Sequence, residues 1–326
     1  MGRNPEPEIT RELHRRLQDW YRREGRHDLP WRKTRDPYRI YLSEIMLQQT
    51  RVETVLERFY FPFLERFPTL ASVAEAPEEA VLKAWEGLGY YRRARYLHQT
   101  AKRTAGRLPA SARELEQLPG IGRSTARAVA CFAFGEALPI LDANVRRVLY
   151  RFFARAKAGE RELWALAESL FDEKRAYDYN QAMMDLGAEI CTPKSPECAR
   201  CPLSAGCGGK ASPERYPEAR RRKKLPRRRR RILVHRKGER LALQRAEEGF
   251  HGGLWRFPQS EEFAKGRILG ELRRVYSHFI LEASVQEVDA LPDDLTVEYL
   301  LPEKIEKLPL GAADREALAL ALREAR

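Results

Sequence analysis

Four closely spaced cysteines constrain the fold of this chain more than any other feature. Cys191, Cys198, Cys201 and Cys207 follow the spacing C-x6-C-x2-C-x5-C, interrupted by prolines that favour tight, irregular loops. Four soft thiolates so arranged predict a metal site. Zinc usually prefers two C-x2-C pairs and only one is present, so an iron–sulfur cubane fits better, although both centres need four thiolates. Cys131, in the apolar stretch AVACFAF, is interpreted as core packing and not as a ligand.

The length and charge of the chain indicate two domains and a polyanionic partner. At 326 residues each domain can bury its own core. Lysine plus arginine number 60 against 47 aspartates and glutamates, a net charge of +13 that favours nucleic acid as the partner. No apolar run is long enough to span a bilayer, and the N-terminal MGRNPEPEIT lacks the apolar core of a signal peptide. We expect a cytoplasmic, nucleoid-associated protein that is a monomer by default.

Helical signals run from about residue 10 to about residue 190. Leu13, Leu17, Trp20 and Tyr21 lie on one face of an expected helix that follows a Thr10 cap. Comparable caps and apolar stripes recur as far as the cysteines. The first two-thirds of the chain is therefore expected to be all-α.

The composition changes abruptly between Pro213 and Arg231, where prolines and basic residues dominate. We interpret residues 213–231 as a linker between a helical domain, residues 1–212, and a smaller domain, residues 232–326. The charge of the linker either grips phosphates or forms a solvated run with only non-specific attraction. The second domain has α/β character, with strands expected at 232–234, 241–243 and 284–288 and a closing helix at 315–326.

Two glycine-rich turns point to DNA. Leu118-Pro119-Gly120-Ile121-Gly122 lies between two expected helices, as in a helix-hairpin-helix, and the amides of Gly120 and Gly122 would face a phosphate. An ordinary glycine-rich turn is the alternative. The second turn, Gly87-Leu88-Gly89, is followed by Tyr90 and Tyr91, whose rings could stack or wedge between bases unless they are buried in the core.

Several of these segments together resemble one family. They are LSEIMLQQT (42–50), WEGLGYYRRAR (85–95), LPGIGRSTA (118–126), LDANVRRVL (141–149) and NQAMMDLGAEIC (180–191). The chain resembles the MutY adenine DNA glycosylases over nearly all of residues 10–210, and the cysteine spacing matches too. The resemblance implies an all-α glycosylase domain with a 4Fe-4S cluster, and a base excision repair enzyme that removes adenine mispaired with 8-oxoguanine or guanine in double-stranded DNA.

Two carboxylates are the candidate catalytic pair. Glu44 stands among apolar residues of a helix, where desolvation would raise its pKa and let it hold a proton. From the residues alone, Glu44 could equally be a partly exposed helix residue and Asp142 an N-cap. The resemblance implies that Glu44 protonates the adenine ring, that Asp142 supports the cationic sugar, and that Asn144 helps to hold the site.

The resemblance also assigns residues that handle the flipped base. Gln48, four residues after Glu44 and so expected on the same helical face, and Tyr90 would act as wedges near the orphaned base. Ser124, counted among the DNA-contact residues, stands where strand-cutting glycosylases carry a Schiff-base lysine, and serine cannot form an imine. A monofunctional enzyme that leaves an abasic site is therefore expected.

The second domain resembles a MutT or Nudix-type domain at LALQRAEEGFHGGLWRFPQ, residues 241–259. It lacks the acidic R-E-x-x-E-E box that would bind magnesium, so pyrophosphatase activity is not expected. The resemblance implies a role in recognising 8-oxoguanine through Ser277 and His278, in a Tyr276-Ser277-His278 sequence where the family has phenylalanine first. The alternative is that both residues merely cap a strand.

Two other functions remain open from the sequence. One is an endonuclease III-like glycosylase for oxidised pyrimidines, which Ser124 and the second domain disfavour. The other is a non-catalytic iron–sulfur protein that only binds DNA, which Glu44 and Asp142 disfavour.

Overall fold

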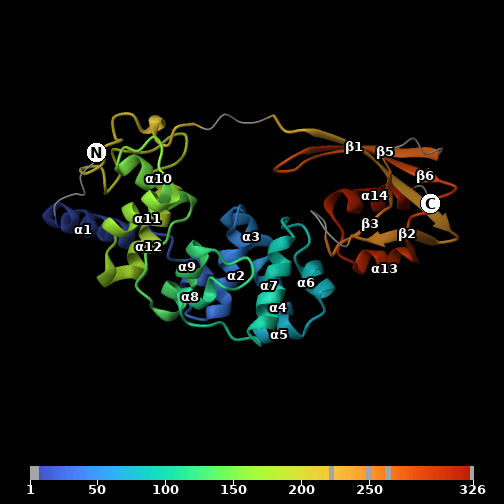
Figure 1. Cartoon of the computed structure of the whole chain (residues 1–326), viewed down its shortest axis with the longest axis horizontal. Coiled ribbons are helices and arrows are strands. Elements are labelled where there is room, and N and C mark those ends of the chain that lie inside the picture. Colours follow the sequence, from blue (N-terminus) through green and yellow to red (C-terminus); the bar gives the residue numbers. More distant parts are fainter. Residues whose placement is uncertain (1–6, 220–223, 247–251, 261–265, 324–326) are drawn as a thin grey trace. The chain divides into compact units, whose positions relative to one another are not determined.

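The computed structural model describes residues 7–219, 224–246, 252–260 and 266–323. The chain divides into two compact units, each built from segments distant in sequence (Figure 1). Unit 1 takes residues 1–48 and 108–221, and unit 2 takes residues 49–107 and 222–326. The expected domains follow sequence order, whereas unit 2 draws its first helices from the middle of the expected helical domain.

Unit 1 is helical, as the sequence predicts. Its α-helices are α1 (Pro7–Glu24), α2 (Pro37–Leu47), α8 (Ala112–Leu115), α9 (Arg123–Phe134), α10 (Ala143–Phe152), α11 (Glu160–Ser169) and α12 (Ala176–Asp185). Short 3-10 turns occur at η1 (Pro30–Arg32), η2 (Glu173–Arg175) and η4 (Pro213–Arg215), and a π-helical turn, η3 (Leu186–Ile190), extends α12.

The apolar stripe of α1 forms part of the main core of unit 1, which confirms the predicted periodicity. Leu13, Leu17 and Trp20 are at most 3% exposed. They belong to one cluster with Val148 and Phe152 of α10. Residues at these spacings share one face of a helix, so burying that face joins α1 to the helix that begins after Asp142.

A second apolar cluster joins α2 to α9. Ile40 of α2 packs in it with Ala128 and Cys131 of α9. Cys131 is only 1% exposed, which confirms its interpretation as a core residue. Because α2 carries Glu44 and α9 begins at the glycine-rich hairpin, this packing fixes two elements of the candidate site against each other.

Unit 2 combines helices with a mixed sheet. The helices are α3 (Val52–Arg58), α4 (Tyr60–Arg66), α5 (Leu70–Glu75), α6 (Glu78–Ala84), α7 (Arg92–Arg103), α13 (Pro302–Lys307) and α14 (Ala312–Arg323). The strands are β1 (Arg227–Lys237), β2 (Arg240–Arg245), β3 (Trp255–Arg256), β4 (Gln259–Ser260), β5 (Gly266–Val275), β6 (Ile280–Val288) and β7 (Glu298–Leu300). The prediction of α/β character is therefore confirmed for this region.

The sheet has the strand order β3-β2-β1-β6-β5, with β4 paired to β1 and β7 to β2. β1 and β6 run parallel, and the other pairs are antiparallel. Helix α14 lies against β1, β5 and β6. At Gly270 of β5 an added Cβ would lie 2.9 Å from the Leu320 side chain, so glycine lets helix and strand approach closely.

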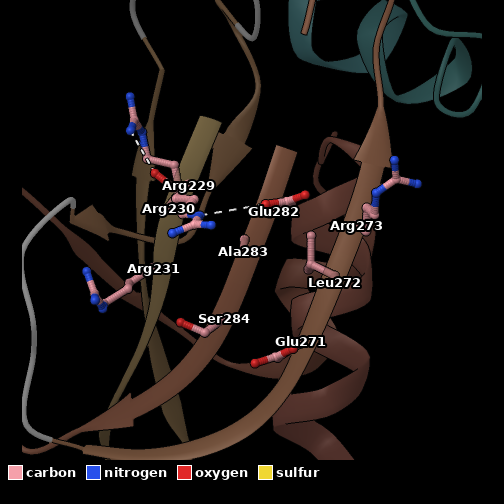
Figure 2. Close-up of a pocket in the computed structure, with 9 residues that line it drawn as sticks. All are labelled: Arg229, Arg230, Arg231, Glu271, Leu272, Arg273, Glu282, Ala283 and Ser284. Atoms are coloured by element: carbon pink, nitrogen blue, oxygen red, sulfur yellow. Dashed lines mark hydrogen bonds and ion pairs between the residues drawn. The ribbon is translucent and has the colours of Figure 1, made fainter. Parts of the chain in front are cut away.

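The expected linker ends earlier than predicted, because its last residues, Arg227–Arg231, belong to β1. Their backbone pairs with Ile280–Ser284 of β6. Pairing uses backbone groups whatever the side chains, and at this end of the sheet the arginines reach solvent. Figure 2 shows this region, where Glu282 of β6 lies 3.7 Å from Arg229 in an ion pair. The Glu282 carboxylate thus neutralises part of the positive charge of Arg227–Arg231.

Candidate active site

Glu44 lies on α2, half-buried, with Leu42 and Ile45 packed in the interior. Burial, and after it the negative charge of Asp142, raises the pKa of Glu44 to about 7, while the positive charge of Arg32 opposes the shift. The direction is the one that the sequence predicts. A carboxyl group with this pKa is protonated in a large fraction of molecules at neutral pH, so it can act as a general acid.

Asp142 is the N-cap of α10. Its Oδ1 accepts a hydrogen bond from the Val145 amide at 2.7 Å, and its Oδ2 accepts one from the Asn144 side-chain amide at 3.4 Å. Burial raises the pKa of Asp142, and the hydrogen bonds from Val145 and Asn144 oppose that rise. A helix N-terminus favours a nearby anion. The capping role left open by the sequence and a catalytic role are therefore compatible in one carboxylate.

Arg147, which the sequence analysis missed, holds Asn144 in place. Its guanidinium donates to Asn144 Oδ1 at 2.9 Å, to the Gly187 carbonyl at 2.5 Å and to the Cys191 carbonyl at 2.7 Å. Gly187 is required here, since an added Cβ would lie 2.6 Å from the Asn144 Cβ. The one available signal was the three-residue spacing of Asn144 and Arg147 on a helix.

A buried ion pair supports the same region. Arg32 of η1 donates two hydrogen bonds to Asp185 of α12, from Nη1 to Oδ2 at 2.6 Å and from Nη2 to Oδ1 at 2.8 Å. The Asp185 side chain is fully buried. The charge of Arg32 is the one that lowers the pKa of Glu44. No local sequence pattern indicates this pair, because the two residues are 153 positions apart.

The glycine-rich hairpin forms as predicted, between α8 and α9. Gly120 has φ of 71°, a left-handed conformation that favours glycine. Gly122 is the N-cap of α9 and provides no side-chain cap, and both glycines are exposed. In the first turn of α9, Ser124 Oγ accepts a hydrogen bond from the amide of Leu141, the residue before Asp142, at 3.3 Å. The hairpin is thus tied to the segment that carries the candidate carboxylate.

Gln48 directly follows the helix that carries Glu44. Helix α2 ends at Leu47, and Gln48 is its C-cap, with a non-helical ψ of 109°. Its φ of −58° is still helical, and only the chain after it leaves the helix, so the shared face with Glu44 stays a prediction. The Gln48 amide donates to the Thr125 hydroxyl at 3.4 Å, which places it against the first turn of α9.

In unit 2 the second glycine-rich turn presents Tyr90. This residue has φ of 49° and follows Gly87 and Gly89, whose φ values of 95° and 76° are also positive. The Tyr90 side chain is 38% exposed, and Arg93 lies over its ring at 5.3 Å. Tyr91 is 9% exposed, so one ring of the pair belongs to the interior and the other faces outward.

Ser277 and His278 lie in the turn between β5 and β6, and both are exposed. The Tyr276 amide donates to the Phe279 carbonyl at 2.9 Å, which closes the turn. Ser277 Oγ and His278 Nδ1 are 3.2 Å apart. Residues of this turn and of the Tyr90 turn line one pocket within unit 2. Its lining includes Gly87, Gly89, Tyr90, Tyr91, Val275, Tyr276, Ser277, Gly311 and Ala312.

The four cysteines Cys191, Cys198, Cys201 and Cys207 line one hollow, which also includes Arg151. Across the described part of the chain, no group of three or more histidine, cysteine, aspartate or glutamate side chains is arranged to hold a metal ion. The guanidinium of Arg151, a residue only 3% exposed, donates to Cys191 Sγ at 3.3 Å. No carboxylate pairs with Arg151 among the ion pairs of the described residues, so a buried cation faces the thiols.

Comparison with known proteins identifies the family. The family model for "HhH-GPD superfamily base excision DNA repair protein" matches residues 42–173. A solved structure of a thermostable thymine-DNA glycosylase is 30% identical, with a TM-score of 0.58 over 63% of this chain and 97% of that one. The chain belongs to the HhH-GPD superfamily.

Within that superfamily the chain is similar to adenine DNA glycosylases, which confirms the resemblance found in the sequence. The adenine DNA glycosylase of Buchnera aphidicola subsp. Baizongia pistaciae is 42% identical over 58% of this chain and 56% of the relative. That of Homo sapiens is 43% identical over 59% of this chain and 38% of the relative. The matched region thus spans about half the length of these curated relatives. No helix in the described residues is long and apolar enough to cross a membrane.

Proposed function

We propose that this protein is an adenine DNA glycosylase of base excision repair that removes adenine mispaired with 8-oxoguanine or guanine. The observation that carries the proposal is the pair formed by Glu44, whose pKa burial raises to about 7, and Asp142, whose negative charge contributes to that rise. Adjacent carboxyl groups with different environments suit the two tasks of cleaving a glycosidic bond. The similarity to adenine DNA glycosylases supports the choice of base.

In the proposed reaction Glu44 donates its proton to the adenine ring as the bond between the base and the sugar C1′ breaks. The bonding electrons leave with adenine, and the carboxylate of Asp142 stabilises the positive charge that develops on the sugar. Water then adds to C1′, and its proton returns to the Glu44 carboxylate. Asn144 and Arg147 keep Asp142 oriented through their hydrogen bonds. The products are free adenine and an abasic site.

DNA binding is proposed for the hairpin and the Tyr90 turn. The uncapped N-terminus of α9 at Gly122 offers amides to a phosphate without reading sequence. The target adenine must leave the duplex to reach Glu44, and Tyr90, exposed on a tight turn, suits the space beside the orphaned base. The hydrogen bond from Gln48 to the first turn of α9 supports a role for this residue near the proposed phosphate contact.

Recognition of 8-oxoguanine is proposed for the turn that carries Ser277 and His278. Both side chains are exposed, and Ser277 lines the same pocket as Tyr90. A hydroxyl and an imidazole can each donate or accept hydrogen bonds at a base edge. The residues 232–326 would then form the recognition domain, and the residues 1–212 the glycosylase domain.

A 4Fe-4S cluster is the proposed cofactor, held by Cys191, Cys198, Cys201 and Cys207. The fit rests on the four thiols around one hollow and on the buried guanidinium of Arg151, which would offset the negative charge of thiolate ligands. When bound, such a cluster would order the loop of residues 191–207. Hydrolysis is not a redox reaction, so the cluster takes no part in the bond-breaking steps.

The test uses purified protein and duplexes with adenine opposite 8-oxoguanine, guanine, cytosine or thymine, resolved with and without hot alkali. We expect strand breaks only after alkali, strongest opposite 8-oxoguanine and absent for the thymine pair. Because Ser124 cannot form an imine with the sugar, breaks without alkali would contradict a monofunctional enzyme. Absence of product from every duplex, despite tight binding, would overturn the proposed function.

A further inference from the structure

Within unit 2 an ion cluster ties α14 to the end of α6. Arg315, in the first turn of α14, binds Glu86 through two bonds, Nε to Oε1 at 2.6 Å and Nη2 to Oε2 at 2.8 Å. Lys83 Nζ also binds Glu86 Oε2, at 2.8 Å. The Arg315 side chain is 30% exposed and that of Glu86 20% exposed. A two-pronged, half-buried pair of this kind holds its partners in one geometry better than an exposed pair does.

The two cations also bind the C-terminal end of α13. Lys83 donates to the carbonyls of Glu306 at 2.6 Å and Leu308 at 3.2 Å, and Arg315 donates to the Leu308 carbonyl at 2.8 Å. The last carbonyls of a helix lack partners within it and carry partial negative charge. Cations from α6 and α14 therefore converge on one backbone segment, Glu306–Leu308, and fix it in place.

Two residues further along, at Leu310, the backbone contacts the turn that carries Tyr90. The Tyr91 hydroxyl donates to the Leu310 carbonyl at 3.2 Å and accepts from the Gly87 amide at 3.4 Å. Glu86 directly precedes Gly87 in the chain. The ion cluster and the Tyr91 bond thus hold both ends of the turn that gives Tyr90 its positive φ.

We propose that Glu86 and Arg315 are a positioning pair that holds the Tyr90 turn opposite the Tyr276-Ser277 turn and so sets the preference for the base opposite adenine. Both turns line one pocket, and so do Gly311, just before α14, and Ala312, its first residue. Neither charged residue lines the pocket, so each acts through the backbone it holds. The inference rests on the proposed function.

The experiment is a double-mutant cycle with Glu86→Gln, Arg315→Met and the combined variant. The quantity measured is the ratio of single-turnover excision rates for adenine opposite 8-oxoguanine and opposite guanine. Each single variant should lower this ratio about fivefold, and the combined variant should lower it no further, since residues of one ion-pair network are not additive. Unchanged ratios in the single variants, or additive losses in the combined variant, would overturn the proposal.

Arg236→Met provides the matched control. Arg236 is similarly exposed, at 24%, and binds Glu287 at 2.7 Å and the Ala321 carbonyl of α14 at 2.5 Å, but nothing in its bonds reaches α6. It should leave the ratio unchanged. A loss equal to that of Arg315→Met would mean that any weakening of α14 has the same effect, and would overturn the specific role of the pair.

Hydrogen exchange separates failure of this inference from failure of the proposed function. If the wild-type protein does not excise adenine, or shows no preference for adenine opposite 8-oxoguanine, that result contradicts only the proposed function. The pair is then judged from backbone amides of residues 87–91 and 308–311. Either single substitution should speed exchange in both segments together; faster exchange only beside the substituted residue would overturn the coupling.

Discussion

The carboxyl groups of Glu44 and Asp142 in unit 1 are buried, whereas the side chains on the two turns of unit 2 are exposed. Glu44 and Asp142 are set in surroundings that desolvate them, and their properties come from shifted pKa values. Tyr90, Ser277 and His278 are exposed, and what distinguishes them is the turn that presents each one. Desolvation raises the pKa of a carboxyl group so that it holds a proton near neutral pH, whereas contact with a DNA duplex requires side chains that reach outward. Substitutions of the two carboxyl groups should therefore alter the rate of excision. Substitutions in the two turns should alter the preference for the base opposite adenine or the affinity for DNA.

Replacing Glu44, the proposed proton donor, should have the largest effect on the rate of excision. Glu44→Gln keeps the shape of the side chain but cannot deliver the proton, so excision should fall about a thousandfold, within the range typical of general acids. DNA affinity should stay within about twofold. Single-turnover rates and equilibrium binding on the same duplex measure both; a large loss of affinity with little loss of rate would reverse the comparison.

The pH dependence should follow the same carboxyl group. Because the proton must be on Glu44, and its pKa lies at about 7, the rate should fall by about tenfold per unit of pH well above that value. The folded pKa is raised from 4.5, so Glu44 supports the fold below 4.5 and this stability is lost as pH rises through about 7. Unfolding of wild type and Glu44→Gln at several pH values checks the second point, and a pH-independent difference between them would refute it.

Removing the exposed groups of the β5–β6 turn should change selectivity and not chemistry. Ser277→Ala with His278→Ala should lower the preference for adenine opposite 8-oxoguanine over guanine by about tenfold, the worth of one or two hydrogen bonds to a base edge. The rate on the guanine duplex serves as the control and should hardly change. Equal losses on both duplexes would assign the turn to general DNA binding.

The smallest effect is expected at the hairpin. Gly120→Ala forces alanine to φ of 71°, at a cost of about 1 kcal/mol that should weaken DNA binding about fivefold. Gly159→Ala is the control, because φ there is −75° and an added Cβ meets nothing within 4 Å. Affinities measured over a range of salt concentrations test this. Equal affinity for both variants would show that the turn conformation does not matter for binding.

Periodic and capping signals predicted the local structure well, while contacts between distant segments could not be predicted. The α1 stripe, the hairpin at Gly120 and the Asp142 cap all depend on neighbours in the chain, and the structure has each of them. The end of α2 before Gln48 was missed because no glycine or proline marks it. Likewise Arg227–Arg231 gave the composition of a linker, although backbone pairing with β6 makes it a strand.

The proposed reacting groups of the candidate site could be named from the sequence, but the residues that support them could not. Glu44 and Asp142 could be found from a helix context and a family motif. Arg32 and Arg315 could not, since their carboxylate partners lie 153 and 229 positions away in the sequence. Arginine is frequent throughout this chain, so composition does not distinguish a buried arginine from a solvated one.

The discontinuous make-up of unit 2 has a consequence for synthesis of the chain. Helices α3 to α7 leave the ribosome long before the strands with which they form one unit. Glu79 and Glu86 stay hydrated until their partners Trp255 and Arg315 have been synthesised. A nascent chain stopped near residue 221 would therefore present Glu79 and Glu86 without these two partners, and it should be a better target for chaperones and proteases than the finished chain.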